Sequence, residues 1–156
     1  MIRTAVRQHL ADRIDQSGIA GSADVSAYYP GDKHTTAEMI FGDRTTGSVT
    51  FPYGMTSPRI QRDQFTVVFV VRITARPDVA DAMARCDELA NHVATILADD
   101  ASLLGFEADG EKVTDTNPDG QGIQVDTREG ENSKGVTLAL AEITVPIETQ
   151  TLNTES

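Results

Sequence analysis

The chain has few of the residues that mark disulfide-rich, zinc-binding or aromatic-cored proteins. Its 156 residues include one cysteine, no tryptophan, three tyrosines and five phenylalanines. A single cysteine excludes an internal disulfide and any zinc site built from several cysteines. With so few aromatic side chains, the core must be built from Val, Ile, Leu and Ala with a few Phe. Cys86 falls on an apolar helical stripe, which favours a small buried hydrophobic residue over a reactive thiol.

Basic residues are also scarce. Thirteen Lys and Arg stand against 24 Asp and Glu, giving a net charge of −11 and a pI near 4.5. Because phosphate contacts need a clustered basic surface, this balance argues against sequence-specific nucleic-acid binding. No stretch approaches the roughly 18 apolar residues of a membrane span, and the start of the chain has no signal-peptide apolar region. We expect one domain, made in the cytoplasm, without membrane contact.

Local motifs for catalysis are missing. There is no Gly-x-Ser-x-Gly and no phosphate-binding glycine loop that ends in Lys-Ser or Lys-Thr. His9, His34 and His92 fall in a helix, a loop and a second helix, without ligand spacing. Glu88 and His92 share a helix face, where a solvated ion pair is favoured over an acid/base pair. We therefore expect neither an enzyme nor a cofactor.

The most strongly patterned stretch runs from Arg62 to Leu97. Its first part alternates in the manner of a strand, with apolar residues at Phe65, Val67, Phe69, Val71 and Ile73. Val68 and Val70 make the middle of the second face apolar, so the strand should lie inside a sheet and be covered on both faces near its centre. Asp78 then caps an amphipathic helix. The helical stripe consists of Val79, Met83, Cys86, Ala90, Val93 and Leu97, widened by Ala82, Leu89 and Ile96.

An amphipathic helix is also predicted at the start of the chain. Apolar residues recur there at four-residue spacing, at Ile2, Val6, Leu10 and Ile14, and Gly18 ends the helix. The opposite face carries Arg3, Arg7 and Arg13. Two interpretations stay open for these arginines: a solvated face, or a docking face for an acidic neighbouring subunit.

The rest of the chain predicts short strands and loops. Strands are expected at 25–29 and 37–41, followed by a Thr/Gly-rich loop at 44–48. The acidic, glycine-rich segment 106–135 predicts a protruding loop or hairpin. A closing strand at 136–147 alternates and then changes phase, as a β-bulge would produce. Within it, Pro146 predicts that the end of the strand lies at a sheet edge or beyond the ladder. Together these elements predict an α+β fold over residues 1–147, with two main helices on a small mixed or mostly antiparallel sheet, and a polar, disordered tail at 148–156.

One short segment fits the pattern of a calcium-binding loop. Asp115, Asn117 and Asp119 place oxygen ligands on alternate residues, Gly120 follows, and Asp126 stands at the twelfth position. The flanks do not read as helices, however, and Asn117-Pro118-Asp119-Gly120 is also a favourable turn sequence for the tip of a hairpin. We expect a turn and no metal.

The connection between Gly42 and Arg62 is long and rich in chain-breaking residues, yet it holds apolar side chains that are poorly suited to water. These candidate interface residues are Phe51, Tyr53, Met55 and Ile60. Long irregular loops in small domains are usually functional. Tyr and Met are also favoured at protein interfaces, so we expect a neighbouring chain to cover this loop.

The order of these elements resembles a known family. The N-terminal helix is followed by VSAYYPG (25–31), EMIFG (38–42), the long strand, the helix ARCDELANHVATIL (84–97), an Asp-x-x-Leu-x-Gly exit (100–105) and the closing strand. This pattern resembles the tail terminator proteins of long-tailed bacteriophages, also called tail completion or head–tail joining proteins, over residues 1–147.

The resemblance implies a structural virion protein that forms a homohexameric ring. The ring would end polymerisation of the tail tube and join the tail to the head connector, or stopper, at the head-proximal end of the tail. Its partners would be other copies of itself, the tail tube protein and the connector protein, with DNA passing through the ring. Another head–tail connector or neck protein is the nearest alternative. A calcium- or small-ligand-binding module is the alternative from a different class.

Overall fold

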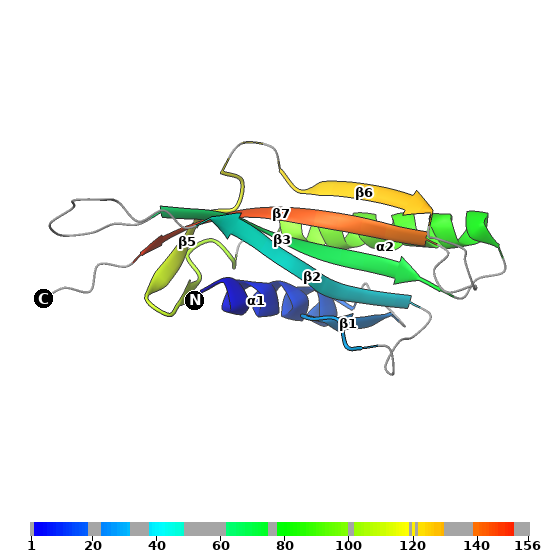
Figure 1. Ribbon diagram of the computed structural model, residues 1–156, viewed down its shortest axis with the longest axis horizontal. Helices are drawn as coiled ribbons and strands as arrows, with labels where there is room; N and C mark the ends of the chain where they lie inside the picture. The colour runs from blue at the N-terminus through cyan, green and yellow to red at the C-terminus, as the bar shows by residue number, and fades with distance from the viewer. Residues whose placement is uncertain are drawn as a thin grey trace, which may run out of the picture.

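The computed structural model describes residues 2–18, 23–31, 38–48, 62–74, 78–99, 102–118, 120, 122–129 and 139–151. The elements in these residues are α1 (Ile2–Gln16), β1 (Asp24–Ser26), β2 (Glu38–Ser48), β3 (Arg62–Ile73), α2 (Val79–Ala98), β4 (Glu107–Ala108), β5 (Glu111–Asp115), β6 (Gln124–Glu129) and β7 (Ala139–Thr151). The strands form one mixed sheet in the order β1-β2-β3-β7-β5-β4, with β6 also paired to β7 (Figure 1). Only the β1–β2 pair is parallel among these pairings. The predicted α+β class is confirmed.

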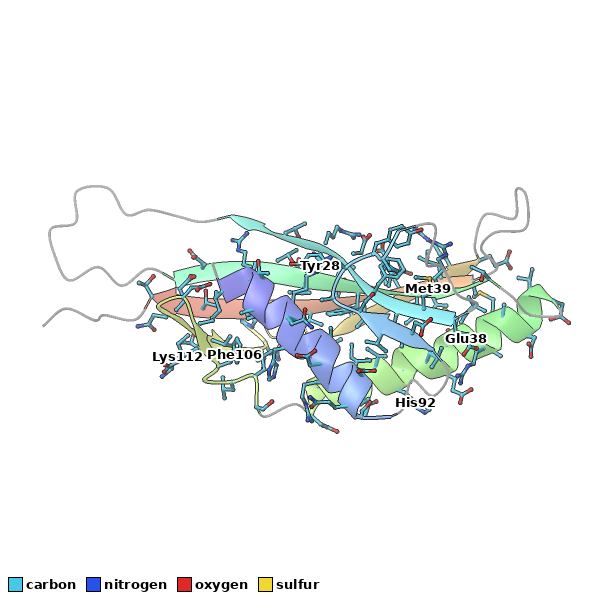
Figure 2. All side chains as sticks on the ribbon, turned by 90° about the horizontal axis from the view of Figure 1, so that it is seen from below. Tyr28, Glu38, Met39, His92, Phe106 and Lys112 are labelled. Atoms are coloured by element: carbon cyan, nitrogen blue, oxygen red, sulfur yellow. The ribbon has the colours of Figure 1, made fainter. Side chains whose placement is uncertain are left out.

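The predicted central strand is β3, which pairs with β2 on one side and β7 on the other. Its odd-numbered residues from Phe65 to Ile73 are all buried, in the same core cluster as the apolar stripes of both helices. Both helices therefore cover one face of the sheet, and in Figure 2 they lie in front of it. On the other face, Val68 and Val70 are also buried, as predicted. Val70 clusters there with Met39, Phe41 and Leu140.

Local hydrogen bonds and one ion pair position α2. Asp78 is the N-cap, and its side-chain Oδ1 accepts from the backbone N–H of Asp81 at 2.7 Å, as the sequence predicts. Arg85 donates two hydrogen bonds to the carboxylate of Glu38, at 2.9 and 3.1 Å. Paired donors of this kind match the planar carboxylate and fix its orientation. The Arg85–Glu38 ion pair therefore holds α2 next to the first residue of β2.

The predicted loop at 44–48 is wrong, because these residues continue β2 to Ser48. The register shifts between Gly42 and Arg44, so Asp43 sits in a β-bulge and the strand resumes beyond it. Thr45 and Thr46 are good strand residues once β3 lies beside them. Gly42 and Asp43, which in the sequence predict the end of the strand, mark the position of the bulge.

The acidic segment does not protrude as one loop, because much of it joins the sheet. Strands β5 and β6 both pair with β7, one after the other along its length. β6 lies beside residues 139–144 and β5 beside residues 148–151. The side chains of β6 are mostly exposed, so this strand has no apolar alternation that a sequence could reveal. Residues 130–138 lie outside the described part of the chain.

Two predictions for the closing strand need correction. The buried positions of β7 alternate without a change of phase, and its register with β3 is unbroken, so there is no bulge near Ala141. The sequence suggests a change of phase because the alternation of Leu138 and Leu140 predicts that they are core positions. In the described strand the core positions are instead Ala139 and Ala141, and Leu140 faces the other side. The strand also continues to Thr151, so residues 148–151 are not a disordered tail. Pro146 lies opposite Thr66 of β3, and on its other side it falls between the segments that pair with β6 and β5, so no described strand pairs with it there.

Replacing Phe69 with Ala should lower the free energy of unfolding by about 3–5 kcal/mol, because its ring is fully buried at the centre of β3. Chemical denaturation would measure the loss. Thr66→Ala, on the open face of the same strand, is the control and should change stability by less than about 1 kcal/mol. A loss below about 1 kcal/mol for Phe69→Ala would contradict the placement of the core.

Candidate functional site

The four candidate interface residues Phe51, Tyr53, Met55 and Ile60 lie outside the described residues. Of the connection from Gly42 to Arg62, the structure describes β2 and the first residue of β3. The described residues present two kinds of surface, the sheet face without helices, called the open face below, and the outer edges of the sheet.

The residues that fit the calcium-loop pattern form no group that could hold a metal ion among the described residues. Asp115 Oδ1 accepts from the backbone N–H of Asn117 at 2.8 Å, and Asn117 Oδ1 accepts from that of Gly122 at 2.6 Å. Asp126 lies within β6, opposite Glu142. Asp119 is outside the described residues. These side chains stabilise a turn between β5 and β6, which is the alternative that the sequence offered.

The histidines are likewise separate. His9 on α1 contacts Ser102 Oγ at 3.1 Å and the ring of Phe106, with 4.9 Å between ring centroids. His92 is exposed on α2, and His34 is outside the described residues. The carboxylate of Glu88 pairs with Arg85 at 3.4 Å. Among the residues that the structure describes, no three His, Cys, Asp or Glu side chains are grouped so that they could hold a metal ion.

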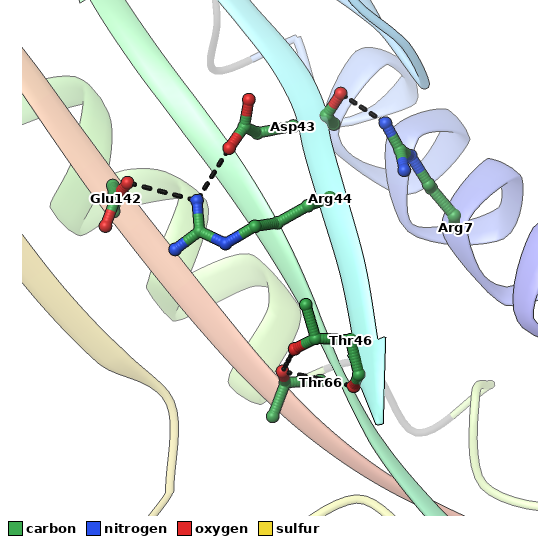
Figure 3. Close-up of polar contacts among 7 residues, drawn as sticks. Arg7, Asp43, Arg44, Thr46, Thr66 and Glu142 are labelled. Atoms are coloured by element: carbon green, nitrogen blue, oxygen red, sulfur yellow. Dashed lines mark hydrogen bonds and ion pairs between the residues drawn. The ribbon is translucent and has the colours of Figure 1, made fainter. Parts of the chain in front are cut away.

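The open face carries polar side chains that link neighbouring strands (Figure 3). Arg44 on β2 donates to Asp43 at 2.6 Å and to Glu142 on β7 at 3.2 Å, and so spans β3. The hydrogen bond to Glu142, and then that to Asp43, raise the pKa of Arg44. Thr46 and Thr66 share a hydrogen bond of 2.8 Å between their hydroxyl groups. These exposed links hold neighbouring strands together beside the apolar cluster of Val70, Met39, Phe41 and Leu140, so the open face is polar at these links and apolar at that cluster.

Arg7 is buried, and neither interpretation offered from the sequence, a solvated face or a docking face, describes it. It lies on α1, only 8% exposed, and its guanidinium donates to the carbonyl oxygens of Ala27 at 2.6 Å and Gly42 at 2.5 Å. The same guanidinium stacks on the ring of Tyr28, with 4.0 Å between its carbon and the ring centroid. A Cβ at position 42 would overlap both Ala27 O and Arg7 Nε, so only glycine fits there. Arg7 is neither solvated nor free to dock an acidic neighbour.

The arginines of α1 cover part of one sheet edge. Among the described pairings, β1 pairs with residues 39–41 of β2, which leaves the later part of β2 without a neighbouring strand on that side. Arg7 binds the Gly42 carbonyl there, and Arg3 donates to the Gly47 carbonyl at 3.5 Å. Native sheets commonly protect their edges with charged side chains or covering elements. On this side, α1 provides both.

The opposite edge of the sheet is not bound by arginines in this way, although α2 lies close to β6. β6 pairs with β7 on one side, and no described strand lies on its other side. Five of its six side chains are exposed, and Val125 is 37% exposed. An unpaired strand edge is a template for pairing with another chain. β6 is therefore the strongest candidate for a contact surface among the described elements.

Hollows border the sheet, and two of them are lined by described residues that carry no charge. One, of about 350 Å³, lies on the open face beside Thr66, Pro146 and Pro118. The other, of about 160 Å³, lies between the end of α2 and the turn around Asn117 and Ile123.

Comparison with known proteins adds no assignment. No protein-family model matches the sequence, and no curated protein matches it significantly. In the described part of the chain, no helix is long and apolar enough to cross a membrane.

Replacing Arg7 with Met should destabilise the fold by about 2–4 kcal/mol, because two buried carbonyl groups lose their charged donor. Arg44→Met is the matched control: it also removes an arginine bound to two oxygens, but an exposed one, and should cost no more than about 1 kcal/mol. Denaturant melts would measure both. Equal losses would show that burial of Arg7 does not determine its contribution.

Cys86 should react slowly with a thiol reagent such as Ellman's reagent at pH 8. Its side chain is fully buried, and burial raises the pKa of the thiol to about 12, so little thiolate forms. The rate should increase by orders of magnitude once urea unfolds the chain. A native rate as fast as the unfolded rate would contradict the burial of this helix face.

Proposed function

We propose that this chain is a structural virion protein of the tail terminator type, a ring-forming subunit that ends tail-tube polymerisation and joins the tail to the head connector. The order α1, β1, β2, β3, α2 and β7 follows the elements that carry the family resemblance, and β4, β5 and β6 are added between α2 and β7. The main support from the described residues is the unpaired outer edge of β6. A subunit that functions alone gains nothing from an exposed strand edge, whereas a subunit that assembles can use it.

The two sides of the sheet differ, and this difference favours a ring. On one side β1 and the later part of β2 form the edge, with Arg3 and Arg7 bound to it. On the other side β6 and β4 form the edge. Contact between unlike surfaces is heterologous, and a heterologous contact closes into a ring when its rotation is a fraction of a full turn. We propose a homohexamer on the family resemblance.

The proposed partners follow from the same role. Each subunit would contact neighbouring copies, and the ring would contact the tail tube protein on one side and the connector protein on the other. The loop with Phe51, Tyr53, Met55 and Ile60 would contribute to one of these contacts. DNA would pass through the ring without sequence-specific binding, in keeping with the net charge of −11. The protein would thus reside at the head-proximal end of the tail, without a catalytic role.

Two alternatives have different experimental signatures. Another connector or neck protein would also form a ring, but would bind the portal side without arresting tube growth in a tube-assembly assay. A calcium-binding module would gain several degrees of melting temperature in millimolar calcium, and would lose this gain when Asp115 is replaced by Ala.

The assembly proposal predicts that Val125→Lys abolishes ring formation while the subunit stays folded. A lysine on β6 adds charge beside the free edge and opposes strand pairing. Light scattering after size exclusion should give six times 16.8 kDa for the unmodified chain and a single 16.8 kDa subunit for the variant.

Ala84→Lys, at an exposed position on α2, is the matched control and should leave the hexamer intact. A single-subunit mass for the unmodified chain at all concentrations and in the presence of tail tubes would contradict the proposed function. A Val125→Lys hexamer would place the contact on another surface.

A further inference from the structure

A buried polar cluster lies at one end of the sheet, near the first turn of α1. Asp63 on β3 and Thr149 on β7 are directly opposite each other in the strand register. They are 5% and 1% exposed, and both lie on the face that the helices cover. Asp63 Oδ1 and Thr149 Oγ1 are buried and have no hydrogen-bond partner within the described structure. Buried polar atoms without partners are rare and costly, so such a pair calls for a physical explanation.

The groups that face Asp63 come from three elements. Thr149 faces it from β7, and Glu111 from β5 places a second carboxylate nearby. Arg3 from α1 adds a positive charge, which acts on Asp63 without a hydrogen bond to it in the described structure. The Nη1 of Arg3 donates to Gly47 O at 3.5 Å, whereas its Nη2 is buried and has no partner among the described residues.

Glu111 already has a structural role at this position. Its Oε2 accepts from the backbone N–H of Ile2 at 3.2 Å, across 109 residues of sequence. No acidic residue occupies the first turn of α1, so Glu111 supplies the negative charge that a helix N-terminus favours. Among the described residues, no comparable donor reaches Oδ1 of Asp63.

The protonation state of Asp63 therefore matters for the fold. Burial raises the pKa of this carboxyl above its ordinary value of 3.8, Glu111 raises it further, and Arg3 opposes the shift. When the folded-state pKa of an acid is raised, its neutral form is the one that the fold favours. The stabilisation is then complete below pH 3.8 and is lost as the pH rises through the raised value.

We propose that Asp63 is a proton-binding site that controls how firmly the first turn of α1 is held against the end of the sheet. With Asp63 neutral, Glu111 alone faces the helix N-terminus and Arg3 stays on the Gly47 carbonyl. With Asp63 ionised, the two carboxylates repel each other and Arg3 is drawn from Gly47 toward Asp63. Both changes loosen the contact between α1 and the sheet, and Arg3 leaves the edge of β2 that it covers.

The test is the pH dependence of stability in Asp63→Asn, which keeps the shape of the side chain and removes its charge. At pH 7 the variant should melt about 2–4 °C above the unmodified chain, and the difference should shrink as the pH is lowered toward 4. Hydrogen exchange at pH 7, corrected for intrinsic rates, should also be slower in the variant over Val6–Leu10. Asp87→Asn, exposed on α2, is the matched control and should show no such pH-dependent difference.

A lower melting temperature for Asp63→Asn at pH 7 would overturn the proposal, because it would mean that the ionised carboxylate stabilises the fold through a cation. If the variant does not fold, carbon NMR of the unmodified chain gives the answer directly. A midpoint for the Asp63 carboxyl above 3.8 supports the proposal, and a midpoint at or below 3.8 overturns it.

Discussion

The unbroken antiparallel pairing of β3 with β7 is the constraint on which the rest of the structure depends. The two strands pair from Arg62 opposite Gln150 to Ile73 opposite Ala139 without a shift in register. Because side chains alternate along a strand, this register puts the buried odd-numbered residues of both strands on one face. Both helices then pack on that face. The outer sides of the pair become the places where β2, β5 and β6 add to the sheet.

The sheet has two edges, and they differ in the side chains that cover them. Along β2, the close approach of Gly42, Ala27 and Arg7 leaves room for a guanidinium and for no side chain at position 42. This contact ties α1, the segment after β1 and the bulged part of β2 to one another. Along β6, no described strand pairs with the outer side, and no described arginine binds it in this way. The asymmetry is the physical basis for proposing contact between unlike edges of neighbouring subunits.

Much of the fold could be predicted where apolar residues recur with a clear period. Both helices, the Asp78 cap and the central strand fall in this class, because packing against a single core imposes the period on the sequence. The later part of β2 could not be predicted, because its Thr and Gly residues lie on an exposed face or beside the bulge and so form no apolar alternation. β6 gave no apolar signal for the same reason, and the small residues Ala139 and Ala141 concealed the true phase of β7.

The candidate site was less predictable than the fold. Arg7 lies beside Val6 and four residues before the buried Ala11, so its place at the border of the apolar stripe was a usable signal, as was Gly42 inside a strand. The partnerless pair of Asp63 and Thr149 depends on the alignment of residues 86 positions apart, which no local pattern reveals. Edge strands are difficult to predict for the same reason, because a strand is an edge only when no other strand pairs with one of its sides, and this depends on the whole fold.

Hydrogen exchange measured at increasing protein concentration tests the central claim most directly, since it reports on each strand as assembly proceeds. The account predicts that the amides of Gln124–Glu129 in β6 become more protected in step with the rise in mass, while those of α2 stay unchanged. Assembly to full mass with no change in the protection of β6 would contradict the account.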